Sequence, residues 1–420
     1  MRPLVRHRAR VLAAALVGGY FLLIAALGGY TKWGRLGVPP MGSKNNLWFG
    51  DLRNVTTAWE CTRRGIAILP LNPCDPWQRP TNYPRLWVFP SFLGLGEGST
   101  FVLGLILAAV FVVAALALVP RDAGYRTGAI YGAALCSPAV MLGIQRGNVD
   151  LAVFAVIVAA VLVSRRELVG TLVADALVLL AAVLKLFPIL ALGFLVRRSQ
   201  RIAWAGAAVV LGAFAMYVVA TRDNIRALAR AVPQVDDTSF GLRRFSEWAS
   251  AAVTDRPSLR VWDIGVVIVV LVAVVLLRRP LRAHLGGAVE NAAAARDLDL
   301  FWAGACIYIG SYALFRSFDY RLVFVLPALP QLLRWAGARR WLGIVTVLAL
   351  FGTLWLDAHW TRVPVISDAL DAWKHVSTLP PAAAAQLVLF IGLAGGLVAT
   401  APAFLPFWRP HSATSRARAE

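Results

Sequence analysis

The sequence has few charged residues for a chain of its length. Asp, Glu, Lys and Arg make up 15% of its 420 residues, whereas 59% are apolar. A soluble domain is about a quarter charged and about 45–50% apolar. A soluble fold of this size could not bury so much apolar surface, but lipid can cover it. The shortage of charge therefore excludes a soluble globular protein and predicts an all-α polytopic membrane protein.

Acidic residues are scarcer still. The 22 Asp and Glu stand against 42 Lys and Arg, which gives a net charge of +20. The arginines cluster in short gaps between apolar runs, such as Arg197-Arg198, Arg278-Arg279 and Arg339-Arg340. This pattern is typical of cytoplasmic loops under the positive-inside rule and not of a nucleic-acid groove, so we expect no nucleic-acid partner.

Metal and nucleotide signatures are missing. The five histidines are scattered and no pair has the spacing of metal ligands, so no metal site is predicted. The sequence also contains no Walker loop and no Rossmann fingerprint. Energy for a reaction must then come from something other than bound ATP, and an activated lipid would suffice. We expect no cofactor apart from such a lipid-linked co-substrate.

Cysteine is rare as well. Cys136 and Cys306 fall within apolar runs, where the expected role is that of a small buried side chain. Cys61 and Cys74 both fall in the first outer loop, where an oxidising compartment would allow them to pair. The turn-forming Asn72 between them would bring them together. We favour a disulfide over two free thiols.

Long apolar runs dominate what is present. They predict about twelve transmembrane helices in a single domain over residues 1–408, followed by a disordered cytoplasmic tail at 409–420. The first run follows basic residues but is longer than the core of a signal peptide, so we expect an uncleaved helix, with cleavage as the alternative. The predicted spans are 11–30, 101–119, 128–144, 149–163, 168–184, 186–196, 201–220, 261–277, 299–315, 322–336, 341–357 and 383–404.

Charge predicts the orientation of these spans. With the N-terminus in the cytoplasm, the inner segments carry more positive charge than the outer ones, although the outer loops contain more residues. Both termini are then cytoplasmic, and the composition rich in Ala, Arg and Val suggests the inner (plasma) membrane of a bacterium. The long hydrophilic loops, at 31–90, 221–260 and 358–382, all fall on the periplasmic side, and long ordered loops on one face usually carry function.

The first outer loop holds the leading candidate for catalysis. Asp51 follows the aromatic pair Trp48-Phe49, which suits the membrane interface, and opens a helix-compatible stretch that includes Arg53. A carboxylate partly shielded from water there could act as a general base. Alternatively, Asp51 merely caps the helix, and spacing favours neither interpretation. Arg53, and Tyr83 before the next span, are candidate substrate contacts.

Two polar segments at the ends of spans add further candidates. Arg146, Asn148 and Asp150 lie in a very short connection, where polar groups are costly unless they line a cavity or pair with each other. We prefer the wall of a binding site to an Arg146–Asp150 ion pair that caps a helix. Lys185 stands at the outer end of a span, beside Pro188, and either holds a phosphate or extends to the surface.

A third cluster, Asp319-Tyr320-Arg321, lies in a short outer turn. Guanidinium groups beside a carboxylate suit a phosphate or a sugar, because Arg offers paired donors, and a local salt bridge is the alternative. The weaker candidates, all in the second outer loop, are Asp236, Asp237, Arg243, Arg244 and Glu247.

The order of these motifs resembles a known family. Asp51 soon after the first span, a turn at Gly65 and the segment Asn82-Tyr83-Pro84-Arg85 match an Asp that opens a helix, a Gly turn and a Thr-Tyr-Pro-Pro-like element. Gly147-Asn148-Val149-Asp150 and Leu184-Lys185-Leu186-Phe187-Pro188 match a Gly-Gln-x-Asn-like turn and a Leu-Lys-x-x-Pro element. Over about residues 45–200 the sequence resembles GT-C type glycosyltransferases of family 87, the polyprenyl-phosphate-mannose-dependent alpha-mannosyltransferases.

This resemblance implies a GT-C-like bundle with a long structured first periplasmic loop. It implies transfer of mannose, or another hexose or pentose, from a polyprenyl phosphate to a lipid or cell-envelope glycan. The implied reaction is an inverting single displacement in which Asp51 deprotonates the acceptor hydroxyl. Lys185, Arg146 or Arg321 would stabilise the leaving lipid phosphate. The expected partners are therefore the sugar donor, the acceptor and membrane lipids.

Two other functions compete with this interpretation. A transporter or flippase of lipid-linked envelope intermediates would show related halves with broken helices in corresponding positions, and the sequence shows neither clearly. An inactive relative that serves as a scaffold in envelope assembly stays an alternative because of departures from the family pattern, such as Arg85 in place of a second Pro.

Overall fold

The structure, a computed structural model, describes residues 7–38, 47–164, 167–197, 201–231, 239–251, 259–285, 292–314, 317–356 and 381–402. The predicted third outer loop lies outside these ranges except at its last two residues, and the predicted tail lies wholly outside them. Asp236 and Asp237, two of the weaker site candidates, also lie outside.

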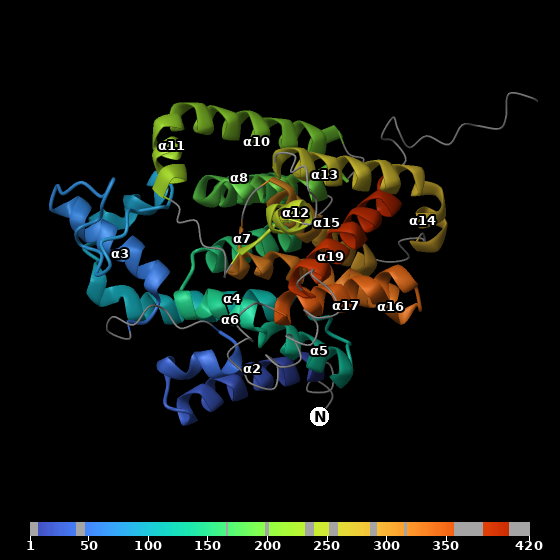
Figure 1. The fold of residues 1–420 in the computed structure, drawn as a ribbon, viewed down its shortest axis with the longest axis horizontal. Coiled ribbons are helices and arrows are strands. Elements are labelled where there is room, and N and C mark those ends of the chain that lie inside the picture. Colours follow the sequence, from blue (N-terminus) through green and yellow to red (C-terminus); the bar gives the residue numbers. More distant parts are fainter. Residues whose placement is uncertain are drawn as a thin grey trace, which may run out of the picture.

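Helices form nearly all of the regular structure in these ranges (Figure 1). The α-helices are α2 (Arg8–Ala26), α3 (Gly50–Arg63), α4 (Thr100–Ala117), α5 (Tyr125–Leu135), α6 (Pro138–Arg146), α7 (Asp150–Val163), α8 (Leu168–Lys185), α9 (Gly193–Val196), α10 (Arg201–Ala220), α11 (Arg222–Ala231), α12 (Leu242–Ala251), α13 (Leu259–Leu276), α14 (Arg278–Leu285), α15 (Ala292–Leu314), α16 (Leu329–Gly337), α17 (Trp341–Trp355) and α19 (Pro381–Thr400).

Shorter elements complete the fold. The 3₁₀-helices are η1 (Tyr30–Leu36), η2 (Arg85–Leu93), η3 (Glu97–Ser99), η4 (Phe187–Leu192) and η5 (Asp319–Ala328). Two short strands, β1 (Ser239–Phe240) and β2 (Ser317–Phe318), pair antiparallel with Ser239 opposite Phe318. This pairing joins the second predicted outer loop to the turn that carries Arg321.

The structure confirms an all-α polytopic membrane protein but not the expected number of spans. Among the described residues, five helices are long and apolar enough to cross a membrane: α2, residues 97–117 including α4, α8, α10 and α19. The total is up to seven if two bent pairs each count as one span; α5 and α6 meet at 55°, and α13 and α14 at 65°. Helices α7 and α17 are apolar but shorter. The expected count of about twelve is therefore not confirmed.

Two predicted spans are broken by 3₁₀-helix. In the span expected at 186–196, α8 ends at Lys185, and η4 and the four-residue α9 follow. Pro188 lacks the N–H that an α-helix would use, which favours the break. In the span expected at 322–336, η5 contains Pro327 and α16 starts two residues later. These breaks place Lys185 and Arg321 at helix ends, where neighbouring segments can surround them.

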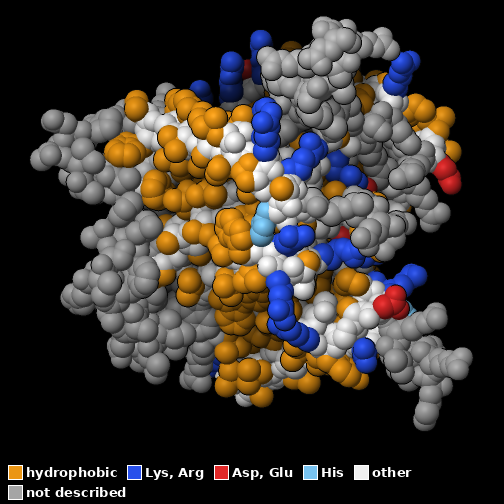
Figure 2. Space-filling view, turned by 90° about the vertical axis from the view of Figure 1, so that its right-hand side faces the viewer, with side chains coloured by type: hydrophobic (Ala, Val, Ile, Leu, Met, Phe, Trp, Pro, Cys, Tyr) orange, Lys and Arg blue, Asp and Glu red, His pale blue; other side chains and the backbone are white. Residues whose placement is uncertain are grey.

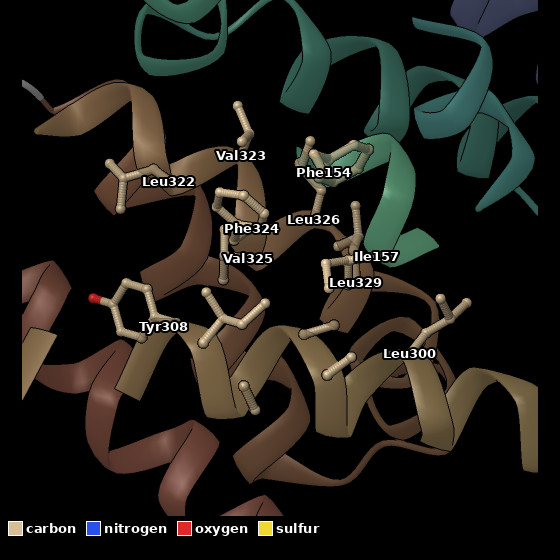
Figure 3. Packing of buried hydrophobic residues seen from close by; sticks show 14 of the residues in the cluster. Phe154, Ile157, Leu300, Tyr308, Leu322, Val323, Phe324, Val325, Leu326 and Leu329 are labelled. Atoms are coloured by element: carbon tan, nitrogen blue, oxygen red, sulfur yellow. The ribbon is translucent and has the colours of Figure 1, made fainter. Parts of the chain in front are cut away.

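The hydrophobic core joins α7, α15 and η5 (Figure 3). Phe154 of α7 packs against Phe324 of η5, with ring centroids 6.2 Å apart. Phe324 also meets Phe187 of η4 edge to face at 5.2 Å. All three rings are buried. Because Phe187 lies two residues after Lys185, and Phe324 three residues after Arg321, the core fixes the backbone beside both cations.

The first outer loop packs through a second, smaller apolar cluster. Its buried members are Phe49, Leu52, Val55, Trp59, Tyr83 and Val149. This cluster seats α3 against η2 and against the turn between α6 and α7. The predicted disulfide is confirmed: Cys61 and Cys74 are bonded, with Cα atoms 5.9 Å apart. It closes the loop between the end of α3 and the segment that leads to Arg79.

Basic side chains gather at the end of the molecule opposite α3. Figure 1 shows α3 at one end of the long axis and α14 with α16 at the other. In Figure 2, which faces that other end, Lys and Arg side chains form a cluster between apolar areas, with few acidic side chains among them. This distribution is what the positive-inside rule predicts for an inner face. The assignment of this end to the cytoplasm stays a prediction.

Candidate active site

Asp51 lies in the first turn of α3 and is buried. The N-cap position belongs to Phe49, so the capping alternative for Asp51 is wrong. A negative charge in the first turn remains favourable, because the helix N-terminus carries partial positive charge. The start of α3 places this carboxylate next to polar groups from other segments.

The Asp51 carboxylate has three such partners. Asn148 Nδ2 donates a hydrogen bond of 2.6 Å to Asp51 Oδ2. On the other oxygen, Arg79 Nη1 lies 3.8 Å and Arg146 Nη1 3.9 Å from Asp51 Oδ1. At these distances the guanidinium groups make ion pairs without short hydrogen bonds to Oδ1. This oxygen is thus the one placed to accept a proton.

Asn148 is oriented by a second contact. Its Oδ1 accepts a hydrogen bond of 3.0 Å from the backbone N–H of Asp150, which fixes the amide so that Nδ2 faces Asp51. The preceding Gly147 has φ +58°, and a Cβ there would lie 2.9 Å from the Phe49 Cβ. Glycine therefore permits both the left-handed turn and the close approach of α3 to the α6–α7 connection.

Arg79 is a site residue that sequence reasoning missed. Its Nη2 donates to the Gly50 carbonyl at 2.6 Å and to Asp75 Oδ2 at 2.9 Å. Asp75 is buried and also accepts a 2.9 Å hydrogen bond from Asn54 Nδ2. Arg79 is thus anchored to α3 and to the disulfide-bonded loop at once. The available signal was the Asp75–Arg79 spacing next to a paired cysteine, in a loop already expected to be ordered.

A second cluster of charges forms around Asp150, which is fully buried. Lys185 Nζ lies 3.1 Å from Asp150 Oδ1, and Arg321 Nε lies 3.6 Å from Asp150 Oδ2. Asp150 thus pairs with these two cations, and the alternative of an Arg146–Asp150 cap is not what forms. Lys185 does not extend to the surface, since its side chain is only 9% exposed. Three segments far apart in the sequence therefore meet at one carboxylate.

Aromatic rings line this second cluster. Lys185 Nζ lies 4.6 Å from the centre of the Tyr83 ring, and the Arg321 guanidinium lies 4.8 Å from that of Phe187. Trp87 Nε1 donates a 3.0 Å hydrogen bond to the Leu184 carbonyl, which holds η2 against the end of α8. Burial raises the pKa of the Tyr83 hydroxyl well above its usual value, and the charge of Asp51 adds to the shift. Tyr83 is therefore a hydrogen-bond donor at neutral pH.

Unusual backbone conformations flank the charged residues. Non-glycine residues with positive φ include Phe49 (56°), Gln78 (53°) and Leu186 (60°). They stand beside Gly50-Asp51, Arg79 and Lys185 respectively. Such conformations are costly and persist only where the surrounding structure enforces them, and they concentrate at functional sites. Their position supports the interpretation of these three segments as one site.

The remaining predicted residues divide into two groups. Tyr320 is buried, which raises the pKa of its hydroxyl, and the charges of Asp51 and Asp150 add to this shift. Asp319 is buried at the start of η5. Arg53, in contrast, pairs with Glu97 and so ties α3 to η3 instead of facing Asp51. Arg243 is also elsewhere, since it pairs with Glu247 of its own helix and with Asp263 of α13.

No group of three or more potential metal ligands occurs among the residues that the structure describes. The arrangement offers a carboxylate, Asp51, beside two arginines. Asn148 joins it to the backbone of Asp150, whose own carboxylate holds Lys185 and Arg321. The site can accept a proton at one end and bind an anion at the other.

Comparison with known proteins identifies a family. A family model described as glycosyltransferase family 87 matches residues 85–312, more than half of the chain. The matched range includes Arg146, Asn148, Asp150 and Lys185, but starts after Asp51 and Arg79. No curated protein and no solved structure matches the sequence.

Proposed function

The chain belongs to glycosyltransferase family 87, and from that membership we propose that it moves a sugar from a polyprenyl-phosphate donor to a lipid or cell-envelope glycan acceptor at the periplasmic face. The family indicates a glycosyltransferase, and the apolar helices indicate a membrane protein. The sugar we propose is mannose or another hexose or pentose. The reaction we propose is a single displacement with inversion.

The observation that carries the proposal is the hydrogen-bonded link between two charge clusters. Asn148 contacts Asp51 through Nδ2 and the Asp150 backbone through Oδ1. The base candidate and the cation pair are therefore held at a fixed separation by one short turn. A glycosyl transfer needs a base for the acceptor and positive charge for the leaving group, on opposite sides of the anomeric carbon.

In the proposed reaction Asp51 takes the proton of the acceptor hydroxyl. The acceptor oxygen forms a bond to the anomeric carbon as the bond between this carbon and the phosphate oxygen breaks. The bonding electrons leave with polyprenyl phosphate, which gains one negative charge. No second carboxylate nucleophile is needed, because a single displacement inverts the anomeric centre without a covalent enzyme intermediate.

The charge around Asp150 suits a phosphodiester donor. Lys185 and Arg321 share this one carboxylate, so the three groups together carry one unit of positive charge in excess. A polyprenyl-phosphate sugar is a phosphodiester with one negative charge, which this excess can balance. As the bond breaks, the phosphate gains charge, and preorganised cations favour that change most in a site shielded from water.

The transporter alternative predicts broken helices in corresponding positions of two related halves. The two bent pairs are a specific observation of that kind. Only the first pair, α5 with α6, leads into the site; α13 and α14 contribute no residue to it. The two bends do not contribute equivalent residues to one site, as related halves of a transporter would. The family membership also favours the enzyme.

The experiment uses purified protein in lipid vesicles with radiolabelled polyprenyl-phosphate mannose and total membrane lipid as acceptor. Asp51→Asn is compared with wild type and with Asp122→Asn, a matched change at an exposed position outside the site. We expect transfer by wild type and Asp122→Asn, and a loss of about 10²-fold or more in Asp51→Asn, the usual contribution of a general base. Full activity of Asp51→Asn would remove the proposed role of this residue. Lipid movement between leaflets without sugar transfer by wild type would favour a transporter.

A further inference from the structure

Helix α11 carries a row of arginines at the end of the molecule that holds α3. Arg222, Arg226 and Arg230 are spaced four residues apart, so their side chains fall on one side of the helix. All three are exposed, with 68% of the Arg222 side chain and 70% of the Arg226 side chain accessible. Leu228, on the opposite side of the helix, is buried. The row is therefore a surface feature that the packing of the protein does not explain.

The charge of this row is only partly balanced within the protein. Asp223 Oδ1 lies 3.6 Å from Arg226 Nη1 and 3.9 Å from Arg222 Nε, and the Asp223 side chain is exposed as well. Exposed pairs of this kind contribute little to stability, because water weakens their attraction. Arg230 has no acidic partner among the residues that the structure describes. Three arginines against one aspartate leave α11 with two positive charges in excess.

The fold turns α11 across the direction of a membrane span. Helix α10, one of the candidate spans, ends at Ala220, and α11 starts at Arg222. Figure 1 shows α11 leaving the end of α10 at a steep angle, at the end of the molecule that carries α3. A basic amphipathic helix that follows a span and turns away from it suits the plane of the membrane, at the level of the lipid head groups.

Neighbouring contacts support this level independently. The Tyr217 hydroxyl, near the end of α10, donates a hydrogen bond of 3.4 Å to the Val183 carbonyl near the end of α8. Trp87 of η2 donates to the next carbonyl of α8. The same η2 exposes Phe89 and Phe92, whose rings meet edge to face at 5.3 Å. Exposed aromatic rings beside spans are typical of the membrane interface, so the ends of α8 and α10 lie at that level.

We propose that Arg222, Arg226 and Arg230 of α11 bind anionic phospholipid head groups of the outer leaflet. A guanidinium group donates paired hydrogen bonds to phosphate oxygens, and a row of arginines on an interfacial helix contacts several head groups at once. Lys and Arg are disfavoured in outer loops next to spans, so such a row in the second predicted outer loop requires a partner of opposite charge. This interaction lies outside the proposed sugar transfer.

The interaction also affects the candidate site. Because Tyr217 joins the end of α10 to the end of α8, head groups bound at α11 hold the end of α8 at the same level. Helix α8 ends at Lys185, the cation proposed to face the phosphate of the donor. Lys185 is thereby kept at the depth where lipid phosphates lie.

A phospholipid fits this surface better than the polyprenyl-phosphate donor does. The row is open to its surroundings and has no enclosed wall that could distinguish one lipid phosphate from another. Lys185 and Arg321, in contrast, are largely buried around a shared carboxylate. Phospholipids are also far more abundant in a membrane than polyprenyl phosphates, so they occupy an unselective surface first.

Two head-group probes test the proposal on the full-length protein in phosphatidylcholine vesicles. One probe is a phosphatidylglycerol and the other a phosphatidylcholine, each with the same photoreactive diazirine in the head group and each at the same low fraction. Mass spectrometry of peptides that contain residues 222–231 gives the ratio of labelling by the anionic probe to labelling by the zwitterionic probe. The zwitterionic probe reports whether α11 lies among the head groups, and the ratio reports its preference for negative charge.

We expect a ratio of about five or more in the wild type at low salt, which falls toward one in 1 M NaCl because salt screens exposed charges. Replacement of all three arginines by Gln should lower the ratio about fivefold or more, since each cation at the surface contributes to the attraction. Replacement of all three by Lys keeps the charge and should retain most of the preference. Asp223→Asn removes the acidic side chain of α11 and should raise the ratio.

An unchanged ratio in the Gln variant would overturn the proposal. Equal losses in the Gln and Lys variants would also overturn it, because charge would then not be the cause. If neither probe labels α11, the helix lies outside the head-group layer and the proposal is wrong. A parallel sample receives polyprenyl phosphate with a diazirine near its phosphate, at the same fraction. Stronger labelling of α11 by this probe than by the phosphatidylglycerol probe would assign the row to the donor instead.

Discussion

Asn148 connects Asp51 and Asp150, donating to the side chain of the first at 2.6 Å and accepting from the backbone of the second at 3.0 Å. Both carboxylates are buried. One amide thus contacts the Asp51 carboxylate on one side and the Asp150 backbone on the other, and it orients the carboxylate. The proposed role of Asp51 as a base depends on this orientation.

Replacement of Asn148 tests that dependence. In Asn148→Ala the Asp51 carboxylate loses its 2.6 Å hydrogen bond from the α6–α7 connection. We expect kcat for sugar transfer to fall roughly 10–100-fold, as for a misplacement of about 1 Å, with little change in the KM of the donor. Asn148→Asp should lose more, because it adds a third carboxylate. An unchanged kcat in Asn148→Ala would show that Asp51 does not depend on this contact.

The Lys185–Asp150 pair supports a prediction about stability. Lys185→Met removes the closer of two cations from a buried carboxylate, and breaking a buried pair costs about 3–5 kcal/mol. Because Arg321 remains, we expect a loss near the lower end of this range in thermal unfolding in detergent. The double variant Asp150→Asn with Lys185→Met should regain neither stability nor activity, because it leaves Arg321 without its carboxylate. A double variant more stable than Lys185→Met would contradict the prediction.

A comparison of Gly147 with Gly65 separates the cost of a left-handed backbone conformation from the cost of a steric clash. Both have positive φ, but only at Gly147 would a Cβ meet other atoms, at 2.9 Å from Phe49 Cβ. Each Gly→Ala change should cost about 1–2 kcal/mol for the left-handed conformation. Gly147→Ala should cost about 1–3 kcal/mol more, because Phe49 must move. Since Phe49 precedes Gly50-Asp51, Gly147→Ala should also lower sugar transfer, whereas Gly65→Ala should not.

The disulfide supplies a prediction about reduction. Cys61 and Cys74 are separated by 13 residues, and a bridge over a short loop stabilises by about 2–4 kcal/mol. Dithiothreitol, or Cys61→Ser with Cys74→Ser, should lower the unfolding temperature. It should also lower activity, because Asp75 follows Cys74 and holds Arg79 beside Asp51. Cys136→Ser, at a free cysteine, should leave the response to dithiothreitol unchanged.

Much of the site was predictable because intramembrane charge is costly and therefore conspicuous in an apolar sequence. Asn148 and Asp150 stand out for this reason, Lys185 because it ends an apolar run, and Asp51 and Arg321 because they lie in outer segments next to spans; the structure brings these residues together. The sequence did not predict which of these residues pair with each other. The alternative of a local contact between Arg146 and Asp150 was the one pairing that spacing offered. The partners of Asp150 come instead from α8 and η5, and spacing along a chain carries little information on such distant contacts.

Other features required the three-dimensional fold. Arg79 lies in a hydrophilic loop, where one arginine among several has no distinguishing feature, and only the position of Asp75 directs it to Asp51. Arg53, two residues after Asp51 on a helix, projects in a different direction and reaches Glu97 instead. The breaks before η4 and within η5 were signalled by Pro188 and Pro327, but hydropathy alone treats both segments as continuous spans.

The shared carboxylate at Asp150 also determines when the site becomes complete during synthesis. A ribosome makes the chain from its N-terminus, so Asp51, Asp150 and Lys185 enter the membrane well before Arg321. Until then, Lys185 and Asp150 cancel each other's charge. Arg321 supplies the excess positive charge of this cluster with roughly three-quarters of the chain already made. A nascent chain that ends before Arg321 therefore contains a neutral Lys185–Asp150 pair in place of the cationic cluster.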